Sequence, residues 1–99
     1  MELANIDWGS LGFGFMPTDY NVRCNYSNGK WGELEVHAEA TMPMHVSAAV
    51  LHYAQECFEG LKAFRGVDGK VRIFRIEENA KRMQSSCRGV CMPEFPIEM

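Results

Sequence analysis

The sequence predicts an α+β fold, a mostly antiparallel sheet of hairpins covered by one long helix. Two turn signals indicate hairpins, because Asn28-Gly29 and Asp68-Gly69 each join stretches with strand-like patterns. A third observation is an apolar stripe between residues 77 and 90, whose spacing fits one face of a helix. No internal repeat, low-complexity tract or linker divides the 99 residues, so one domain is expected.

The first hairpin is expected to follow a Gly-, aromatic- and Pro-rich arm or loop over residues 1–17, ahead of a globular part over residues 18–99. Apolar and polar residues alternate over residues 20–26, which is typical of a half-buried strand. After the Asn28-Gly29 turn, the alternation resumes over residues 33–39. An antiparallel hairpin is therefore predicted.

The middle of the chain predicts a connection, a short helix and a second hairpin. Pro43 interrupts any strand ladder, and Ser47 is a suitable N-cap for about two helical turns. A strand over residues 57–65, with apolar residues on both faces, is expected to pair with a strand over residues 71–75. The whole then forms a sheet of four or more strands.

The clearest helix is predicted over residues 77–90. Glu77 and Glu78 suit its first turn, where the macrodipole favours anions, and Pro93 ends it. The expected apolar stripe consists of Ile76, Ala80, Met83, Cys87, Val90 and Cys91.

Composition excludes several classes of function. A chain of 99 residues is expected to bury about 60–70% of its unfolded surface. The net charge of −3 offers no basic surface for nucleic acid, and no apolar run approaches the ~20 residues of a membrane span. The first ten residues lack the pattern of a signal or transit peptide, so a cytoplasmic location is expected. The four cysteines form no CxxC pair, which predicts reduced thiols and no metal site.

The stretch from Leu51 to Arg65 carries the best indication of function. In an extended chain, Phe58, Gly60, Lys62 and Phe64 line one side, and Cys57, Glu59, Leu61 and Ala63 line the other. Gly60 leaves a gap in its face, as where a ligand approaches closely, and Lys62 adds a cation. A packed strand with a bulge at Gly60 and a solvated Lys62 is the alternative.

The order and spacing of the residues in this stretch are also specific. The matching residues are Leu51-His52-Tyr53, Phe58 to Gly66, the frame Tyr53-x4-Phe58-x-Gly60-x-Lys62, Phe13-Gly14, Thr18-Asp19, Asn79-x-x-Arg82-Met83 and Met92-Pro93. Together they resemble the class IV pyridoxal-phosphate aminotransferases, and within them the branched-chain amino-acid aminotransferases. The resemblance implies the N-terminal small domain of that fold over residues 1–99, with the large catalytic domain absent.

The resemblance implies roles for six residues. Arg82 contacts the cofactor phosphate, which suits a planar guanidinium; otherwise it is a helix arginine paired with Glu78. Ile76 stands where relatives usually have a proline, a change that affects capping more than this contact. The five residues implied for the substrate are Tyr53 and Phe58 as walls of the side-chain pocket, Gly60 as the gap, Lys62 at the polar edge and Phe13 closing the pocket from the arm. The alternative for Tyr53 and Phe58 is core packing.

As the resemblance implies, the full enzyme transfers the amino group of leucine, isoleucine or valine to 2-oxoglutarate, with pyridoxal 5'-phosphate as cofactor and as a homodimer. Its Schiff-base lysine lies in the second domain, so no catalytic residue is expected within residues 1–99, and the fragment alone is predicted to fold but to be inactive. A non-catalytic interaction module is one alternative. D-amino-acid aminotransferases and aminodeoxychorismate lyases, which share the fold, are the others.

Overall fold

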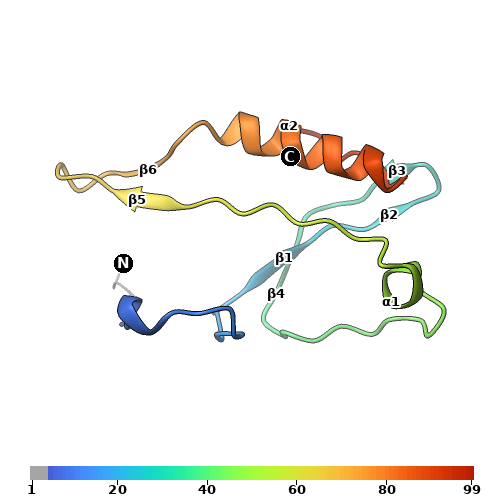
Figure 1. The fold of residues 1–99 in the computed structure, drawn as a ribbon, viewed down its shortest axis with the longest axis horizontal. Helices are drawn as coiled ribbons and strands as arrows, with labels where there is room; N and C mark the ends of the chain where they lie inside the picture. The colour runs from blue at the N-terminus through green and yellow to red at the C-terminus, as the bar shows by residue number, and fades with distance from the viewer. Residues whose placement is uncertain (1–4) are drawn as a thin grey trace.

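The computed structural model describes residues 5–99, so the first four residues of the predicted arm lie outside it. It is an α+β structure with a long helix, and this class was predicted correctly (Figure 1). The helical elements are η1 (Trp8–Ser10), α1 (Ala49–Tyr53) and α2 (Ile76–Gly89). The strands are β1 (Asn21–Arg23), β2 (Tyr26–Ser27), β3 (Lys30–Trp31), β4 (Glu35–His37), β5 (Ala63–Arg65) and β6 (Val71–Ile73).

The strands pair antiparallel, as expected, but they do not form one sheet. Three two-stranded ladders are present within residues 5–99: β1 with β4, β2 with β3, and β5 with β6. The expectation of a single sheet with four or more strands is therefore wrong. Local turn signals predict each pair, whereas joining the pairs into one sheet depends on contacts between distant segments.

The first hairpin has the predicted turn and an additional bulge. Asn28 and Gly29 have φ angles of 52° and 79°, the left-handed pair that a tight two-residue turn requires. Two residues (24–25) separate β1 from β2, whereas three (32–34) separate β3 from β4. The extra residue is a bulge, stabilised by the Gly32 amide donating to the Asn25 carbonyl at 2.7 Å.

The second hairpin closes through glycines and one acidic side chain. Gly66 donates to the carbonyl of Lys70 at 2.8 Å, and Gly69, with φ 78°, donates back to Gly66 at 2.9 Å. Asp68 accepts two hydrogen bonds from the guanidinium of Arg72, at 2.9 and 2.7 Å. This ion pair fixes the turn against β6.

Two local expectations in the middle of the chain are wrong. Ser47 does not cap α1, because its hydroxyl pairs with Nδ1 of His45 at 2.7 Å and Ala48 takes the N-cap position. Of the predicted strand over residues 57–65, only β5 pairs with a neighbour, and residues 54–62 run without a ladder partner. These residues still form the face of the candidate site described below.

α2 begins one residue before its predicted start and ends in a Schellman motif. Arg75, in the left-handed region with φ 50°, precedes it without a side-chain cap. At the C-terminus, Met92 donates to the carbonyl of Cys87 at 2.9 Å and Cys91 to that of Arg88 at 3.2 Å. Cys91 has a φ of 58°, a conformation that usually selects glycine.

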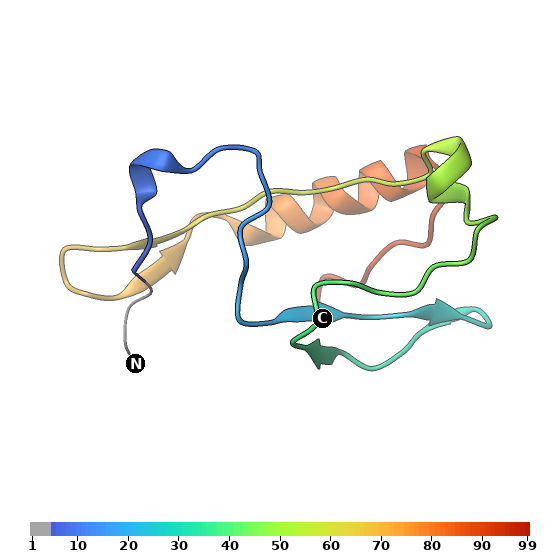
Figure 2. The same ribbon diagram turned by 90° about the horizontal axis from the view of Figure 1, so that it is seen from below.

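The structure is open, which corrects the expected burial. Its accessible surface is 9066 Å², whereas a compact protein of this mass exposes about 5,700 Å². Its radius of gyration is 16.3 Å, compared with about 13 Å for a compact chain of this length. Figure 2 shows the first hairpin and α2 as two layers on opposite sides of the molecule. The chain buries about 45% of its unfolded surface rather than 60–70%.

The small core lies beside α2. Cys87 is the only fully buried residue among residues 5–99. The extended segment 54–62 covers one side of α2, and the chain after the helix returns along it, where Gln84 donates to the carbonyl of Phe95 at 2.9 Å. Phe95 in turn packs edge-on against Trp31, with ring centroids 4.8 Å apart. This contact connects the first hairpin to the helix.

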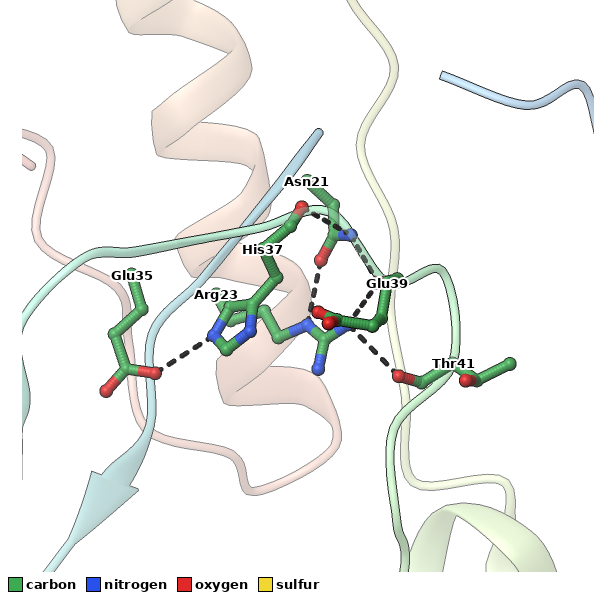
Figure 3. A network of polar contacts seen from close by, with 6 residues as sticks. All are labelled: Asn21, Arg23, Glu35, His37, Glu39 and Thr41. Atoms are coloured by element: carbon green, nitrogen blue, oxygen red, sulfur yellow. Dashed lines mark hydrogen bonds and ion pairs between the residues drawn. The ribbon is translucent and has the colours of Figure 1, made fainter. Parts of the chain in front are cut away.

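A polar network holds the chain after β4 (Figure 3). Nη2 of Arg23 donates to the carbonyls of Glu39 and Thr41, at 2.5 and 3.2 Å. The amide of Asn21 donates to the carbonyls of His37 and Glu39, at 3.2 and 2.8 Å. The carbonyls of Glu39 and Thr41 lie beyond the β1–β4 ladder, and these bonds satisfy them, so Arg23 and Asn21 have a structural role.

Candidate functional site

The segment 54–62 lies along α2 and directs alternate side chains towards it. Cys57 contacts Met83 of the helix, with Sγ 3.5 Å from Sδ, and Glu59 pairs with Arg82. Phe58, which lies between Cys57 and Glu59, and Gly60, which follows Glu59, are exposed. The two predicted faces are therefore present over residues 57–60, even though the strand ladder is not.

Glu59 and Arg82 form a two-contact ion pair. Nε of Arg82 donates to Oε2 of Glu59 at 2.7 Å, and Nη2 donates to Oε1. The Glu59 side chain is only 11% exposed, whereas that of Arg82 is 69% exposed. The hydrogen bond from Arg82, with a second from Asn79, lowers the pKa of Glu59 to about 2. The same contact raises the pKa of Arg82, so both groups stay charged.

Asn79 binds both Glu59 and the next residue, Gly60. Its side-chain amide donates to Oε1 of Glu59 and to the carbonyl of Gly60, both at 3.0 Å. Residues three apart on a helix share a face, so the Asn79-x-x-Arg82 spacing presents both side chains to residues 59–60. The two motifs singled out in the sequence thus meet in space.

Sequence reasoning missed Glu59 as the partner of Arg82. The alternative pairing of Arg82 with Glu78 is wrong, because Glu78 pairs with Lys81 at 3.2 Å and with Arg75 at 3.8 Å. A signal for the observed pair was present in the sequence. Glu59 is a lone acid on an otherwise apolar face of the 57–63 stretch, and a covered acid requires a cation.

The pair leaves one edge of Arg82 available. Among residues 5–99, Nη1 of Arg82 has no hydrogen-bond partner, and the side chain is mostly exposed. A guanidinium edge suits the oxygens of a phosphate or carboxylate. Since Glu59 already balances the charge of Arg82, strong binding of a phosphate requires further donors from outside the described residues.

Gly60 and Lys62 line an open groove of about 450 Å³ between β5, β6 and the start of α2. The groove is lined by Gly60, Leu61, Lys62, Phe64, Ile73, Phe74 and Asn79. Asn79 connects this groove to the Arg82 pair. The structure therefore brings together three predicted site residues, Gly60, Lys62 and Arg82, through one helix and one extended segment.

The other three predicted site residues are not brought to this groove. Tyr53 is 85% exposed and lines a separate hollow of about 430 Å³ with Gln55 and Val90. Phe58 is 91% exposed, and Phe13 is fully exposed on the arm. Core packing, the alternative for Tyr53 and Phe58, is thus wrong in this structure.

The described residues show no other kind of site. Within residues 5–99, no three His, Cys, Asp or Glu side chains converge as ligands of a metal ion. Cys24, Cys57, Cys87 and Cys91 are free thiols. No helix in this part of the chain has the length and apolar character needed to cross a membrane.

Comparison with curated proteins gives consistent relatives, although no protein-family profile matches the chain. The branched-chain-amino-acid aminotransferase of Helicobacter pylori strain J99 is 44% identical over 98 residues, which is 99% of this chain and 29% of that protein. The Haemophilus influenzae enzyme of the same name is 40% identical over 97 residues, 98% of this chain and 28% of that protein. Branched-chain amino acid aminotransferase 2, chloroplastic, of Humulus lupulus is 48% identical over 104 residues, 99% of this chain and 24% of that protein.

This similarity extends over nearly the whole chain, while the chain spans only about a quarter of the length of these relatives. Their shared name does not favour the interaction module or the D-amino-acid aminotransferase. The motifs that meet at Glu59 and Arg82 lie inside the matched region. On this similarity, the chain belongs to the branched-chain-amino-acid aminotransferase family.

Proposed function

We propose that this chain is the N-terminal small domain of an enzyme that transfers the amino group of leucine, isoleucine or valine to 2-oxoglutarate. The observation that carries the proposal is the contact between two motifs, in which Asn79 and Arg82 of α2 hold Glu59 and Gly60. The names of the relatives support the reaction. Their greater length supports a second, larger domain that carries the catalytic lysine.

The cofactor of the proposed enzyme is pyridoxal 5'-phosphate, which supplies an electron sink at the α-carbon of the amino acid. In this proposal Arg82 holds the phosphate through its free Nη1 edge, and Glu59 fixes the plane of the guanidinium. Glu59 neutralises the charge of Arg82, so Arg82 alone would hold a phosphate weakly. This supports a phosphate site that Arg82 shares with donors from the larger domain. The residues present here therefore fit the group in part.

The proposed substrate face consists of Phe58, Gly60 and Lys62, with Tyr53 and Phe13 at its edges. An apolar wall suits a branched side chain, because each buried methylene contributes about 0.8 kcal/mol. Lys62 and the gap at Gly60 adjoin the groove beside Asn79, which supports a polar edge there. The exposure of the three aromatic side chains supports a pocket closed by the larger domain or a second subunit.

A homodimer and a cytoplasmic location complete the proposal. Some relatives are named as chloroplastic and another as mitochondrial, so the compartment is a property of the individual enzyme rather than of the family. The open apolar surface supports an extensive protein contact on this chain.

The test is to titrate the full polypeptide with pyridoxal phosphate and to measure its affinity for the cofactor from the absorbance of the bound form. Arg82→Ala is expected to weaken binding by about 1.5–3 kcal/mol, the range for a hydrogen bond to a charged group. Lys81→Ala is the matched control, because Lys81 is the adjacent cation and pairs with Glu78 instead. Equal affinity of the Arg82→Ala and Lys81→Ala proteins for the cofactor would refute the assignment.

A further inference from the structure

Three sulfur atoms gather where the segment 54–62 crosses α2. Sγ of Cys57 lies 3.6 Å from Sγ of Cys87 and 3.5 Å from Sδ of Met83. Cys57 comes from the extended segment, whereas Met83 and Cys87 lie one turn apart on the helix. Both cysteines are free thiols. Neither takes part in the contacts of Arg82, Asn79 and Glu59.

We propose that Cys57 and Cys87 are a redox-active pair that closes to a disulfide when the protein meets a hydroperoxide. The proposal rests on the sulfur geometry and is independent of the proposed transaminase function. A disulfide bond is about 2.05 Å long, so the two sulfurs must approach by about 1.5 Å. Residues 54–62 lack a ladder partner, so this segment can move against α2 without breaking strand pairing.

The two thiols differ in access, which sets the order of the reaction. Cys57 is half-buried, whereas Cys87 is 5% exposed. Burial, together with the neighbouring Cys57, raises the pKa of the Cys87 thiol. Cys57 therefore meets the oxidant first, because a thiolate that solvent reaches is the form that reacts.

The reaction balances in two steps. The Cys57 thiolate attacks one oxygen of the hydroperoxide, the O–O bond breaks, and a sulfenic acid forms. The other oxygen leaves as hydroxide or alkoxide and takes up the proton that the Cys57 thiol released, giving water or an alcohol. Sγ of Cys87 then attacks Sγ of Cys57, the S–S bond forms and the S–O bond breaks. The departing hydroxide takes the proton of the Cys87 thiol and leaves as water. Two thiols are oxidised and one hydroperoxide is reduced.

The cross-link would join the substrate-face segment covalently to α2. Cys57 is two residues before Glu59, and Cys87 is little more than one helical turn after Arg82. A disulfide at this position restrains the segment against the helix beside the ion pair. The other two cysteines lie elsewhere: Cys24 donates to the carbonyl of Gly32 at 3.3 Å in the first hairpin, and Cys91 is exposed beyond α2.

The sequence makes the experiment direct, because trypsin places every cysteine in a different peptide. The peptides cover residues 24–30, 31–62, 83–88 and 89–99. The native protein is treated with hydrogen peroxide, the remaining thiols are alkylated, and the digest is analysed by mass spectrometry without reduction. We expect peptides 31–62 and 83–88 to appear as one cross-linked species that dithiothreitol separates. Alkylation of Cys57 and Cys87 should be lost in equal amounts.

A Cys24→Ser/Cys91→Ser protein is the matched control and should give the same cross-link. Adding Cys57→Ser to it should abolish the cross-link and leave Cys87 open to alkylation only after unfolding. Three results would overturn the proposal: oxidation of Cys57 to the sulfinic acid while Cys87 stays free, cross-links mainly to Cys24 or Cys91, or links only between two chains. The peptide analysis of the oxidised wild-type protein tests the proposal even if a variant fails to fold.

Discussion

Glu59 and Arg82 form an ion pair whose two members have different surroundings. The carboxylate is nearly covered by its contacts with Arg82, Asn79 and the Gly60 region, whereas the guanidinium is mostly open to solvent. Exposed ion pairs contribute little to stability, because solvent screens them. Solvent screening at the open guanidinium therefore makes the contribution of the pair to folding stability modest, and the pair mainly sets the orientation of Arg82.

The low pKa of Glu59 predicts how this contact responds to acid. A carboxylate whose folded pKa, about 2, lies below its ordinary value of 4.5 contributes stability above pH 4.5 that is lost as the pH falls towards 2. The carbon chemical shift of the Glu59 carboxyl group, followed by NMR, should titrate with a midpoint near 2. In Arg82→Gln the midpoint should rise towards 4.5. A wild-type midpoint near 4.5 would mean that the pair does not form in solution.

Phe58 offers a second test, on substrate rather than cofactor. Its ring is exposed here, so Phe58→Ala should change the stability of this chain by less than about 0.5 kcal/mol, as surface substitutions usually do. If the ring walls the substrate pocket, kcat/KM of the full enzyme for leucine should fall by about tenfold or more, since a buried Phe ring is worth at least 1.4 kcal/mol. Val67→Ala, at the tip of the second hairpin, is the control. Unchanged leucine kinetics would remove Phe58 from the site.

The sequence could predict that Cys57 and Glu59 face away from Phe58 and Gly60, because that depends only on backbone alternation. It could not predict that Arg82 takes Glu59 rather than Glu78. The choice depends on the distance between two segments that lie 23 residues apart in the chain. Asn79 illustrates the same limit: its spacing from Arg82 was visible, but its bond to the Gly60 carbonyl was not.

At the scale of the elements, those that depend on a few adjacent residues were predicted correctly. The Asn28-Gly29 turn and the end of α2 near Pro93 depend on the dihedral preferences of a few adjacent residues, and both formed where expected. The bulge at residues 32–34 and the unpaired run 54–62 depend on strand partners that neighbouring residues do not specify. Element type was therefore predictable, whereas the number of strands in one sheet was not.

The C-terminus of α2 predicts a stabilising substitution. Cys91 has a positive φ, which costs a residue with a side chain roughly 1–2 kcal/mol and costs glycine little. Cys91→Gly should therefore make the protein more stable than Cys91→Ala by about 1 kcal/mol. The comparison uses denaturant unfolding of the full polypeptide, and both variants lack the thiol. If the two variants unfold at the same denaturant concentration, the Schellman motif does not form with this geometry.

The open shape of the chain has a consequence for its behaviour in isolation. Aromatic side chains on the arm, on the proposed substrate face, in β5 and after β6 are exposed, and large exposed apolar areas on soluble proteins usually mark interaction surfaces. These aromatic residues are Trp8, Phe13, Phe15, Tyr53, Phe58, Phe64 and Phe74. An ordinary apolar content predicted a self-sufficient core. Composition does not reveal, however, how many of the apolar residues pack against the rest of a larger protein.

Residues 1–99 expressed alone are therefore expected to be marginally stable and inactive. The m-value for urea unfolding scales with the surface exposed, so it should be about two-thirds of that of a compact protein of equal length. The isolated chain should also bind the dye ANS, which reports exposed apolar surface. Incubation with leucine, 2-oxoglutarate and pyridoxal phosphate should yield no glutamate, because the lysines within residues 5–99 are all exposed and lack the buried surroundings that hold the cofactor. A full m-value without ANS binding would mean that the chain closes on itself in solution. Leucine-dependent glutamate formation would place the catalytic centre within these 99 residues.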